Sequence, residues 1–118
     1  MFALREADKE AWDRTLGLCC KVNLLQTWEY GEAKLQAENW RPVRLMIQNE
    51  DGPLGVVQAL LKPFPVFPLK GGVARINRGP LFTEQVLSGA DSGCIVTKAM
   101  DAIIDEFVQK RRCYLSIT

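Results

Sequence analysis

The chain has 118 residues, of which 47% are hydrophobic and 25% are charged, the composition of one ordinary globular domain. Its 15 basic and 14 acidic side chains give a net charge of +1, so composition offers no argument for a nucleic-acid partner or an anionic membrane surface. Histidine is absent, which excludes Ser-His-Asp and Cys-His catalysis and most zinc sites.

The N-terminus and the cysteines indicate the compartment. Charged residues begin at Arg5 and no apolar stretch follows a basic start, so a secretory signal is not expected. No window reaches the roughly 18 consecutive apolar residues that a membrane-spanning helix needs. The four cysteines form no CxxC motif. We therefore expect a cytoplasmic protein with reduced, structural thiols, and neither a metal nor a cofactor.

The chain begins with a short predicted strand and a helix. Phe2–Glu6 alternates weakly, as a first strand would. Asp8 then makes a good N-cap for a helix that runs to about Leu18. Trp12 and Leu16 are four residues apart, so they share one face of this helix and should point inward.

A second helix is predicted after Thr27, another N-cap candidate. The segment that follows, WEYGEAKLQAEN, is rich in helix formers apart from Gly31. Trp28, Gly31 and Leu35 fall on one face, so the pattern predicts an amphipathic helix with one closely packed position at the glycine.

A hairpin is predicted in the middle of the chain. Pro42–Asn49 and Leu54–Lys62 are rich in branched apolar residues, and EDGP between them carries the Asp-Gly turn signal. A further strand is predicted at Val73–Asn77. The prolines of KPFPVFP separate it from the hairpin, because proline cannot donate to a strand ladder.

The last third of the chain predicts a long helix and a final strand. Ser88, Asp91 and Ser92 are cap candidates, and basic residues at positions 110–112 suit the end of the helix. Cys113–Thr118 is strand-like. The inward stripe repeats every four residues, with a second row beside it: Ile95, Ala99, Ile103 and Phe107, then Val96, Met100, Ile104 and Val108.

The element order is therefore β-α-α-β-β-β-α-β. Antiparallel strands come first, and one helix then crosses to a last strand, which should pair in parallel with its neighbour. This order predicts an α+β fold in which a mixed, mostly antiparallel sheet packs against helices, in a single domain over residues 1–118.

Four segments in order resemble the N-terminal domain of the Fem family of peptidoglycan aminoacyl and peptidyl transferases. They are QTWEYGEAK, NWRPVRL, ARINRGPLF and the helix end KRRCYLSI. The family shows a Q-x-x-x-W/Y-x-x-x-K helix, W-x-P-V at the start of a strand and [KR]-G-P after the fourth strand. The resemblance covers about Leu24 to Thr118.

The resemblance implies a GNAT-like fold, incomplete relative to a full GNAT domain. Fem proteins have two such domains, and they transfer an amino acid from aminoacyl-tRNA to the peptide of a UDP-linked or lipid-linked peptidoglycan precursor. The chain resembles the first, substrate-side domain only. We therefore expect no catalytic residue here, no turnover by the chain alone, and contact with aminoacyl-tRNA only through the second domain.

Three residues are candidates for binding the precursor. Lys34 matches the family lysine that engages the phosphate-bearing nucleotide portion, a role suited to a compact ammonium, although most helical lysines are simply solvated. Tyr30 lies nearly opposite Trp28 on the helix and could line a groove. Arg78 belongs to the basic-Gly-Pro turn, whereas Arg75 falls on the other face of its strand and is the weaker candidate.

Two other functions stay open. A half-GNAT domain leaves a sheet edge and apolar surface uncovered, and self-association, a homodimer for example, or a partner protein could cover them without catalysis. A divergent N-acetyltransferase is the less favoured alternative. The segment QVLSGADSG before the long helix lacks the glycine spacing of the acetyl-CoA pyrophosphate turn and has no basic residue nearby.

Overall fold

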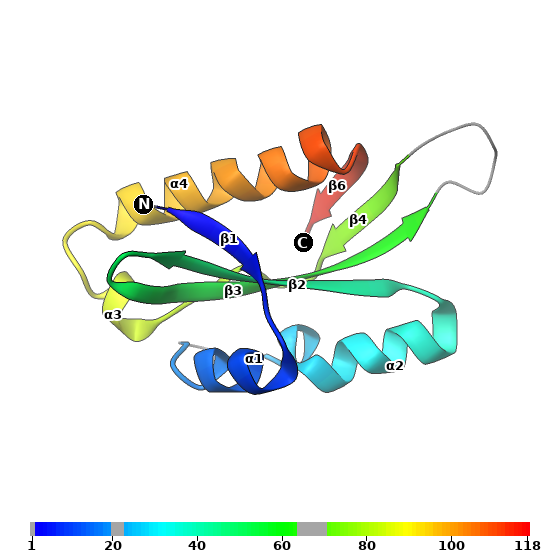
Figure 1. Cartoon of the computed structure of the whole chain (residues 1–118), viewed down its shortest axis with the longest axis horizontal. Coiled ribbons are helices and arrows are strands. Elements are labelled where there is room, and N and C mark those ends of the chain that lie inside the picture. The colour runs from blue at the N-terminus through cyan, green and yellow to red at the C-terminus, as the bar shows by residue number, and fades with distance from the viewer. Residues whose placement is uncertain (1, 20–22, 64–70) are drawn as a thin grey trace.

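A six-stranded sheet separates two layers of helices (Figure 1). The computed structural model describes residues 2–19, 23–63 and 71–118. Helices α1 and α2 lie on one face of the sheet, and α4 lies on the other. The strands are β1 (Ala3–Glu6), β2 (Arg41–Asn49), β3 (Gly52–Pro63), β4 (Gly72–Ile76), β5 (Leu81–Phe82) and β6 (Cys113–Ile117). The helices are α1 (Lys9–Leu16), η1 (Leu24–Gln26), α2 (Trp28–Glu38), α3 (Glu84–Leu87), α4 (Ser92–Ile104) and η2 (Asp105–Lys110).

The sheet topology confirms the predicted α+β class. The strand order is β1-β2-β3-β4-β6, and β5 pairs with β3. Every pairing is antiparallel except that of β4 with β6, which are joined by the α4 crossover. A helical crossover of this length returns the chain in the same direction, so the parallel pair follows from the connection.

The central hairpin forms as predicted, with a tight turn. Asn49 pairs with Gly52, which leaves Glu50 and Asp51 as the connecting residues. Gly52 has a φ of +119°, a backbone conformation that favours glycine. Near this turn the register shifts: Ile47 faces Gly55 but Gln48 faces Pro53, so one extra residue forms a β-bulge.

The N-caps predicted at Asp8 and Thr27 are confirmed. The Asp8 carboxylate accepts a hydrogen bond from the Ala11 amide at 2.8 Å, and the Thr27 hydroxyl accepts one from the Tyr30 amide at 3.2 Å. Helix α1 nevertheless ends at Leu16 rather than Leu18. The next residues turn to bring Cys19 beside Thr83, an arrangement that a local pattern does not reveal.

Helix α2 is not amphipathic in the way its sequence suggested. Leu35 is 39% exposed, and Gly31 is the buried residue of this helix. The prediction fails because α2 approaches the sheet through a glycine and polar contacts, not through a stripe of apolar side chains.

The end of the chain forms the predicted helix and strand, with two elements that the pattern missed. Ala99, Ile103 and Phe107 are fully buried against the sheet, as the first stripe predicted. Ile104 and Val108 of the second row remain 44% and 36% exposed. The short β5 and α3 were not predicted, because two to four residues are too few to show a periodicity. In the described part of the chain, no helix is long and apolar enough to cross a membrane.

Candidate functional site

Lys34 is a partly exposed residue of α2 and is paired with an acid on the next turn. Its Nζ is 2.6 Å from Glu38 Oε2 and 5.8 Å from the centre of the Tyr30 ring. The hydrogen bond with Glu38 raises the pKa of Lys34, and the positive charge of Arg75 opposes that shift. The structure thus brings together two predicted site residues, Tyr30 and Lys34, and adds Arg75.

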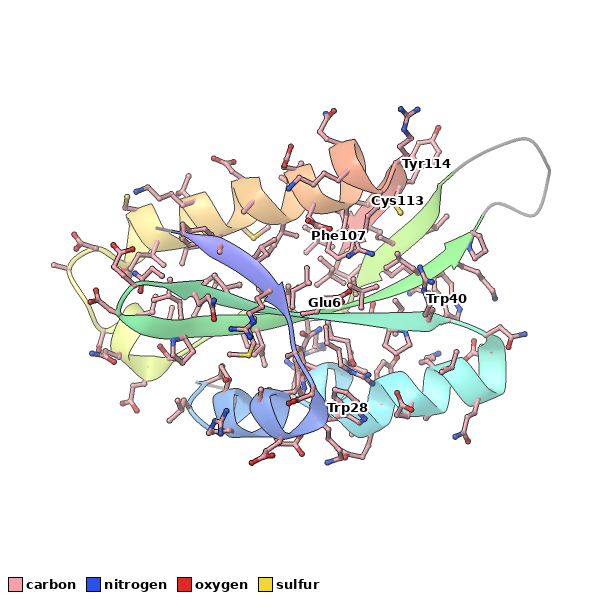
Figure 2. The ribbon with its side chains drawn as sticks, viewed as in Figure 1. Glu6, Trp28, Trp40, Phe107, Cys113 and Tyr114 are labelled. Carbon is pink, nitrogen blue, oxygen red and sulfur yellow. The ribbon has the colours of Figure 1, made fainter. Side chains whose placement is uncertain are left out.

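Two more cations lie close by, around Trp40. Lys62 Nζ is 5.0 Å from the centre of the Trp40 ring, and the Arg75 guanidinium carbon is 5.6 Å from it. Both distances are within the range of cation–π attraction. Figure 2 shows Trp40 near the end of β3, where the chain enters β2.

We call these residues, namely Lys34, Glu38, Trp40, Lys62 and Arg75, the Trp40 cluster. The hydrogen bond to Lys34 lowers the pKa of Glu38, and the charges of Lys62 and Arg75 lower it further. Three cations therefore share one acid, which leaves a net charge of 3 − 1 = +2 on this surface. Such a surface attracts anions, phosphates in particular.

Arg78 lies apart from this cluster, in the turn that follows β4. Its φ of +55° is left-handed, and its amide donates to the Thr118 carbonyl at 2.9 Å. Its own carbonyl accepts a hydrogen bond from the Asn23 side chain at 3.1 Å. The main chain of Arg78 is thus fixed by the fold while its side chain is exposed. It is Arg75, the weaker candidate from the sequence, that lies beside Lys34.

A buried polar network holds the start of α2 onto the sheet. Gln26 is fully buried: its Nε2 donates to the Asn77 carbonyl at 2.8 Å, and its Oε1 accepts from the Gln58 amide at 2.9 Å. The Trp12 indole donates to the Gln26 carbonyl at 3.1 Å. A Cβ at Gly79 would lie 2.8 Å from the Gln26 side chain, so the glycine of the basic-Gly-Pro turn makes room for this glutamine.

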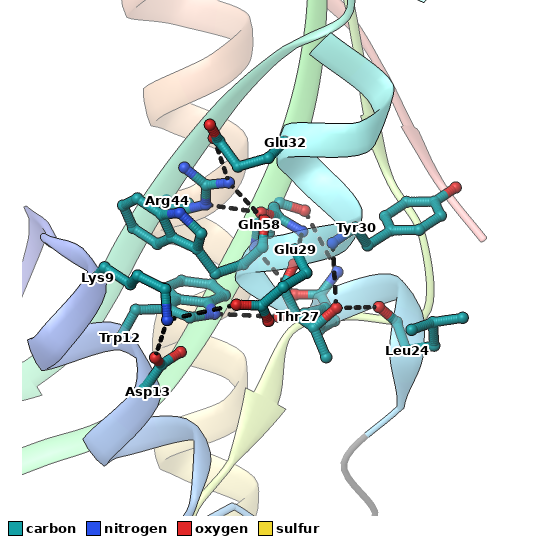
Figure 3. Close-up of polar contacts among 12 residues, drawn as sticks. Lys9, Trp12, Asp13, Leu24, Thr27, Glu29, Tyr30, Glu32, Arg44 and Gln58 are labelled. Carbon is teal, nitrogen blue, oxygen red and sulfur yellow. Dashed lines mark hydrogen bonds and ion pairs between the residues drawn. The ribbon is translucent and has the colours of Figure 1, made fainter. Parts of the chain in front are cut away.

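The network continues from Gln58 to a buried arginine (Figure 3). Gln58 Nε2 donates to the Thr27 carbonyl at 2.9 Å, and its Oε1 accepts from Arg44 Nε at 2.8 Å. Arg44 Nη2 donates to the Trp28 carbonyl at 2.8 Å and to Glu32 at 3.0 Å, and the guanidinium stacks 3.6 Å from the centre of the Trp28 ring. Burial lowers the pKa of Arg44, and the bond to Glu32 opposes that effect.

Gly31 is the position at which α2 meets this network. A Cβ there would lie 2.4 Å from Gln58 Oε1 and 2.6 Å from Arg44 Nη2. Only a glycine lets the helix backbone approach these two side chains without displacing them. The network therefore determines where α2 lies over the sheet, and with it where the Lys34 side chain is presented.

The sequence does not identify this network as a unit. A weak signal exists, because Gln58 interrupts an otherwise apolar strand and Arg44 does the same in its partner. These two residues pair directly across β2 and β3. A polar residue at an inward position requires a hydrogen-bonding partner, but the sequence does not say which residue supplies it.

A separate cavity of about 230 Å³ lies where the chain approaches α4. Asp51 and Asp91 are among its lining residues, together with Gly89, and the described lining contains no basic residue. Carboxylates at this position repel the phosphates of a nucleotide cofactor.

Comparison with known proteins relates the fold, but not the sequence, to other proteins. Neither a protein-family model nor a curated protein sequence matches the chain. The crystal structure of FemX is similar with a TM-score of 0.67 and 18% identity, over 95% of this chain and 25% of FemX. The chain thus spans a quarter of the FemX chain.

Acetyltransferases are similar over more of their own length. The acetyltransferase AAC(6')-Iy, solved with a bisubstrate analog, gives a TM-score of 0.55 and 14% identity, over 100% of this chain and 79% of that enzyme. A ribosomal-protein-alanine N-acetyltransferase from Brucella melitensis gives 0.54 and 12%, over 100% and 79%. At these low sequence identities the structural similarity establishes the fold alone. This chain has a GNAT-like fold.

Proposed function

We propose that this chain is the substrate-side domain of a Fem-type transferase that acts on a peptidoglycan precursor in the cytoplasm. The observation that carries the proposal is the likeness to FemX, with a TM-score of 0.67 over 95% of the chain, against 0.55 for AAC(6')-Iy. The order of the four sequence segments that resemble the family supports it independently. The transfer itself, from aminoacyl-tRNA, is assigned to a second domain.

The Trp40 cluster is where the phosphates of a UDP-linked or lipid-linked precursor would bind. A diphosphate would compete with Glu38 for the Lys34 ammonium, and Lys62 and Arg75 would add charge on the same side. Tyr30 borders this position, next to Lys34. Arg78, in the turn after β4, would meet another part of a long precursor.

The test is a calorimetric or NMR titration of the chain with UDP-MurNAc-pentapeptide. Lys34→Ala should weaken binding about tenfold or more, because a charge-assisted contact is lost. Lys98→Ala is the matched control, since Lys98 is exposed on α4, across the sheet from α2. Equal affinities for wild type and Lys34→Ala, or no binding by either protein, would contradict the proposal.

Acetyl-CoA in a parallel titration separates this function from N-acetyl transfer. We expect no saturable response, because the described residues around the cavity before α4 include two aspartates and no cation. Binding of acetyl-CoA with no response to the precursor would favour an acetyltransferase instead.

Self-association is a second candidate function, favoured by the edge of the sheet. Strand β6 is the last strand in the order, and Ile117 on it is 40% exposed. Ile104 and Val108 of the helix connected to it are also exposed. An edge strand without charged residues can pair with the same strand of a second copy, and exposed apolar side chains can add to such a contact.

A further inference from the structure

Strand β1 is the first strand in the order of the sheet, and it pairs with β2 and with no other strand of the described chain. Directly after β1, the Ala7 amide donates to the Arg44 carbonyl at 3.1 Å, so these two residues form a hydrogen-bonded pair. In an antiparallel ladder every second residue turns its main-chain groups toward the partner strand. The N–H and C=O groups of Leu4 and Glu6 therefore point away from β2.

The main-chain groups on this side of β1 are available for pairing. Ala3, Arg5 and Glu6 are exposed, and Leu4 is half-buried. Within residues 2–19, 23–63 and 71–118, the main chain of Leu4 and Glu6 makes no hydrogen bond to a turn, a loop or a helix. Figure 1 shows β1 in front of the other strands, with no element of the described chain in front of it. Such an edge can accept a further strand.

The side chains of β1 alternate between the two faces of the sheet. Leu4 packs against the core cluster on the α4 face, whereas Arg5 lies opposite Met46, which packs in the cluster on the α1 face. A cavity of about 360 Å³ lies on the α1 face, and Arg5, Arg14, Met46 and Gln48 are among its lining residues. A strand added to β1 would direct every second side chain toward this face.

The two arginines at this cavity have no anionic partner. In the described part of the chain, the side chains of Arg5 and Arg14 make no ion pair and no hydrogen bond. Three acids also line the cavity, but the Glu6 carboxylate pairs with an arginine that follows α4, and the Asp8 carboxylate caps α1. Glu10 alone then stands against two guanidinium groups. Arginine pairs strongly with carboxylates, so the cavity favours an acidic side chain.

We propose that the edge of β1 binds an extended acidic segment of a partner protein, which adds to the sheet as a further strand. Main-chain hydrogen bonds to Leu4 and Glu6 would give affinity, and the cavity would give specificity, as in other proteins that bind peptides at a sheet edge. An acidic side chain of the segment would lie near Arg5 and Arg14. Its neighbours in sequence would lie on the face of Leu4 and would be apolar.

A second copy of the chain fits this edge less well than a partner segment. An antiparallel pairing of two β1 strands that uses both outward residues places Leu4 opposite Glu6 and Arg5 opposite Arg5. Like charges directly opposite each other destabilise a strand pair. The inference does not depend on the proposed function, because the Trp40 cluster belongs to other elements.

The test is an NMR titration of the full chain with a short peptide of alternating valine and glutamate. Binding should be saturable, and hydrogen exchange of the Leu4 and Glu6 amides should slow about tenfold or more in the complex. Exchange of the Arg5 amide, which already faces β2, should change little. The matched peptide with glutamine in place of glutamate should bind about fivefold more weakly, because it lacks the charge that the arginines favour.

Two substitutions separate the main-chain contact from the charge. Glu6→Pro removes an outward N–H and no hydrogen bond to β2, so it should weaken binding about tenfold relative to Glu6→Ala, which loses the same carboxylate but keeps the N–H. Arg14→Ala should weaken the glutamate peptide about fivefold and leave the glutamine peptide unchanged. Arg14 is exposed on α1, so this variant keeps the test valid if proline at position 6 prevents folding.

The inference is overturned if folded wild-type protein shows no saturable response up to about 1 mM peptide, or if the Leu4 and Glu6 amides stay unprotected in the complex. Protection that rises with protein concentration in the absence of peptide would show that a second copy occupies the edge. Displacement of the peptide by UDP-MurNAc-pentapeptide would also overturn it, because the peptide would then occupy the precursor site. Peptide binding without precursor binding would contradict the proposed function alone.

Discussion

At the scale of single residues, Glu38 determines how available Lys34 is. Its lowered pKa keeps Glu38 ionised throughout the neutral range, and the raised pKa of Lys34 keeps the ammonium protonated there. The pair's contribution to stability is lost only as pH falls through the lowered pKa of Glu38, or rises through the raised pKa of Lys34. At neutral pH an anionic ligand must therefore compete with a formed ion pair.

This competition gives a prediction for Glu38→Gln. Removing the acid should raise the affinity for an anionic ligand about two- to fivefold, because exposed ion pairs are individually weak. The ratio of mutant to wild-type affinity should stay constant from about pH 6 to pH 9, since neither partner titrates there. Titration calorimetry at three pH values measures it, with Asp101→Asn on α4 as the control. A lower affinity for Glu38→Gln would show that Glu38 helps to hold the ligand.

At the scale of elements, the position of α2 depends on close contact at Gly31. Arg44 and Gln58 are held by hydrogen bonds to the Trp28 and Thr27 carbonyls, so they cannot move aside without breaking those bonds. Leaving a buried donor or acceptor unpaired costs about 1–3 kcal/mol. The network thus stabilises the helix through polar contacts, where most helices use apolar side chains.

Two glycine substitutions should therefore change stability in opposite directions. Gly31→Ala should lower the free energy of unfolding by about 2 kcal/mol, because its Cβ displaces Gln58 and Arg44, despite the better helix propensity of alanine. Gly93→Ala in α4 should raise it by about 0.5–1 kcal/mol, since no atom lies within 4 Å of the new Cβ. Urea denaturation measures both. A stabilising Gly31→Ala would mean that α2 does not depend on this close contact.

At the scale of the whole molecule, the position of β6 as the last strand in the order of the described sheet bears on self-association. If two copies pair through β6, sedimentation should show a dimer whose population rises with protein concentration. Ile117→Lys should weaken that dimer tenfold or more, because a charge on an edge strand opposes pairing. Thr97→Lys, on the exposed side of α4, is the control. A monomer at concentrations on the order of 100 μM would leave no measurable role for self-association.

Local sequence signals predicted most of the secondary structure. The caps at Asp8 and Thr27, the turn of the β2–β3 hairpin and the Ile95-to-Phe107 stripe each depend on residues close together in the chain. Capping, turn chemistry and periodicity act over a few residues, so the sequence contains them directly. The prediction of an amphipathic α2 was wrong because the side chains that hold α2 in place, Arg44 and Gln58, belong to β2 and β3 and not to the helix itself.

The sequence by itself therefore determined the order of elements, the α+β class and the candidates Tyr30, Lys34 and Arg78. The tertiary structure alone decided which of these lie together. Arg75 and Lys62 lie near the Lys34–Glu38 pair because β3 and β4 pair, and Trp40 lies against both cations. Arg78 does not lie near this pair, because the chain turns at Arg78 after the end of β4. Charge balance over the whole chain concealed a local excess of cations, since a net charge is a sum and a binding surface depends on where each charge lies.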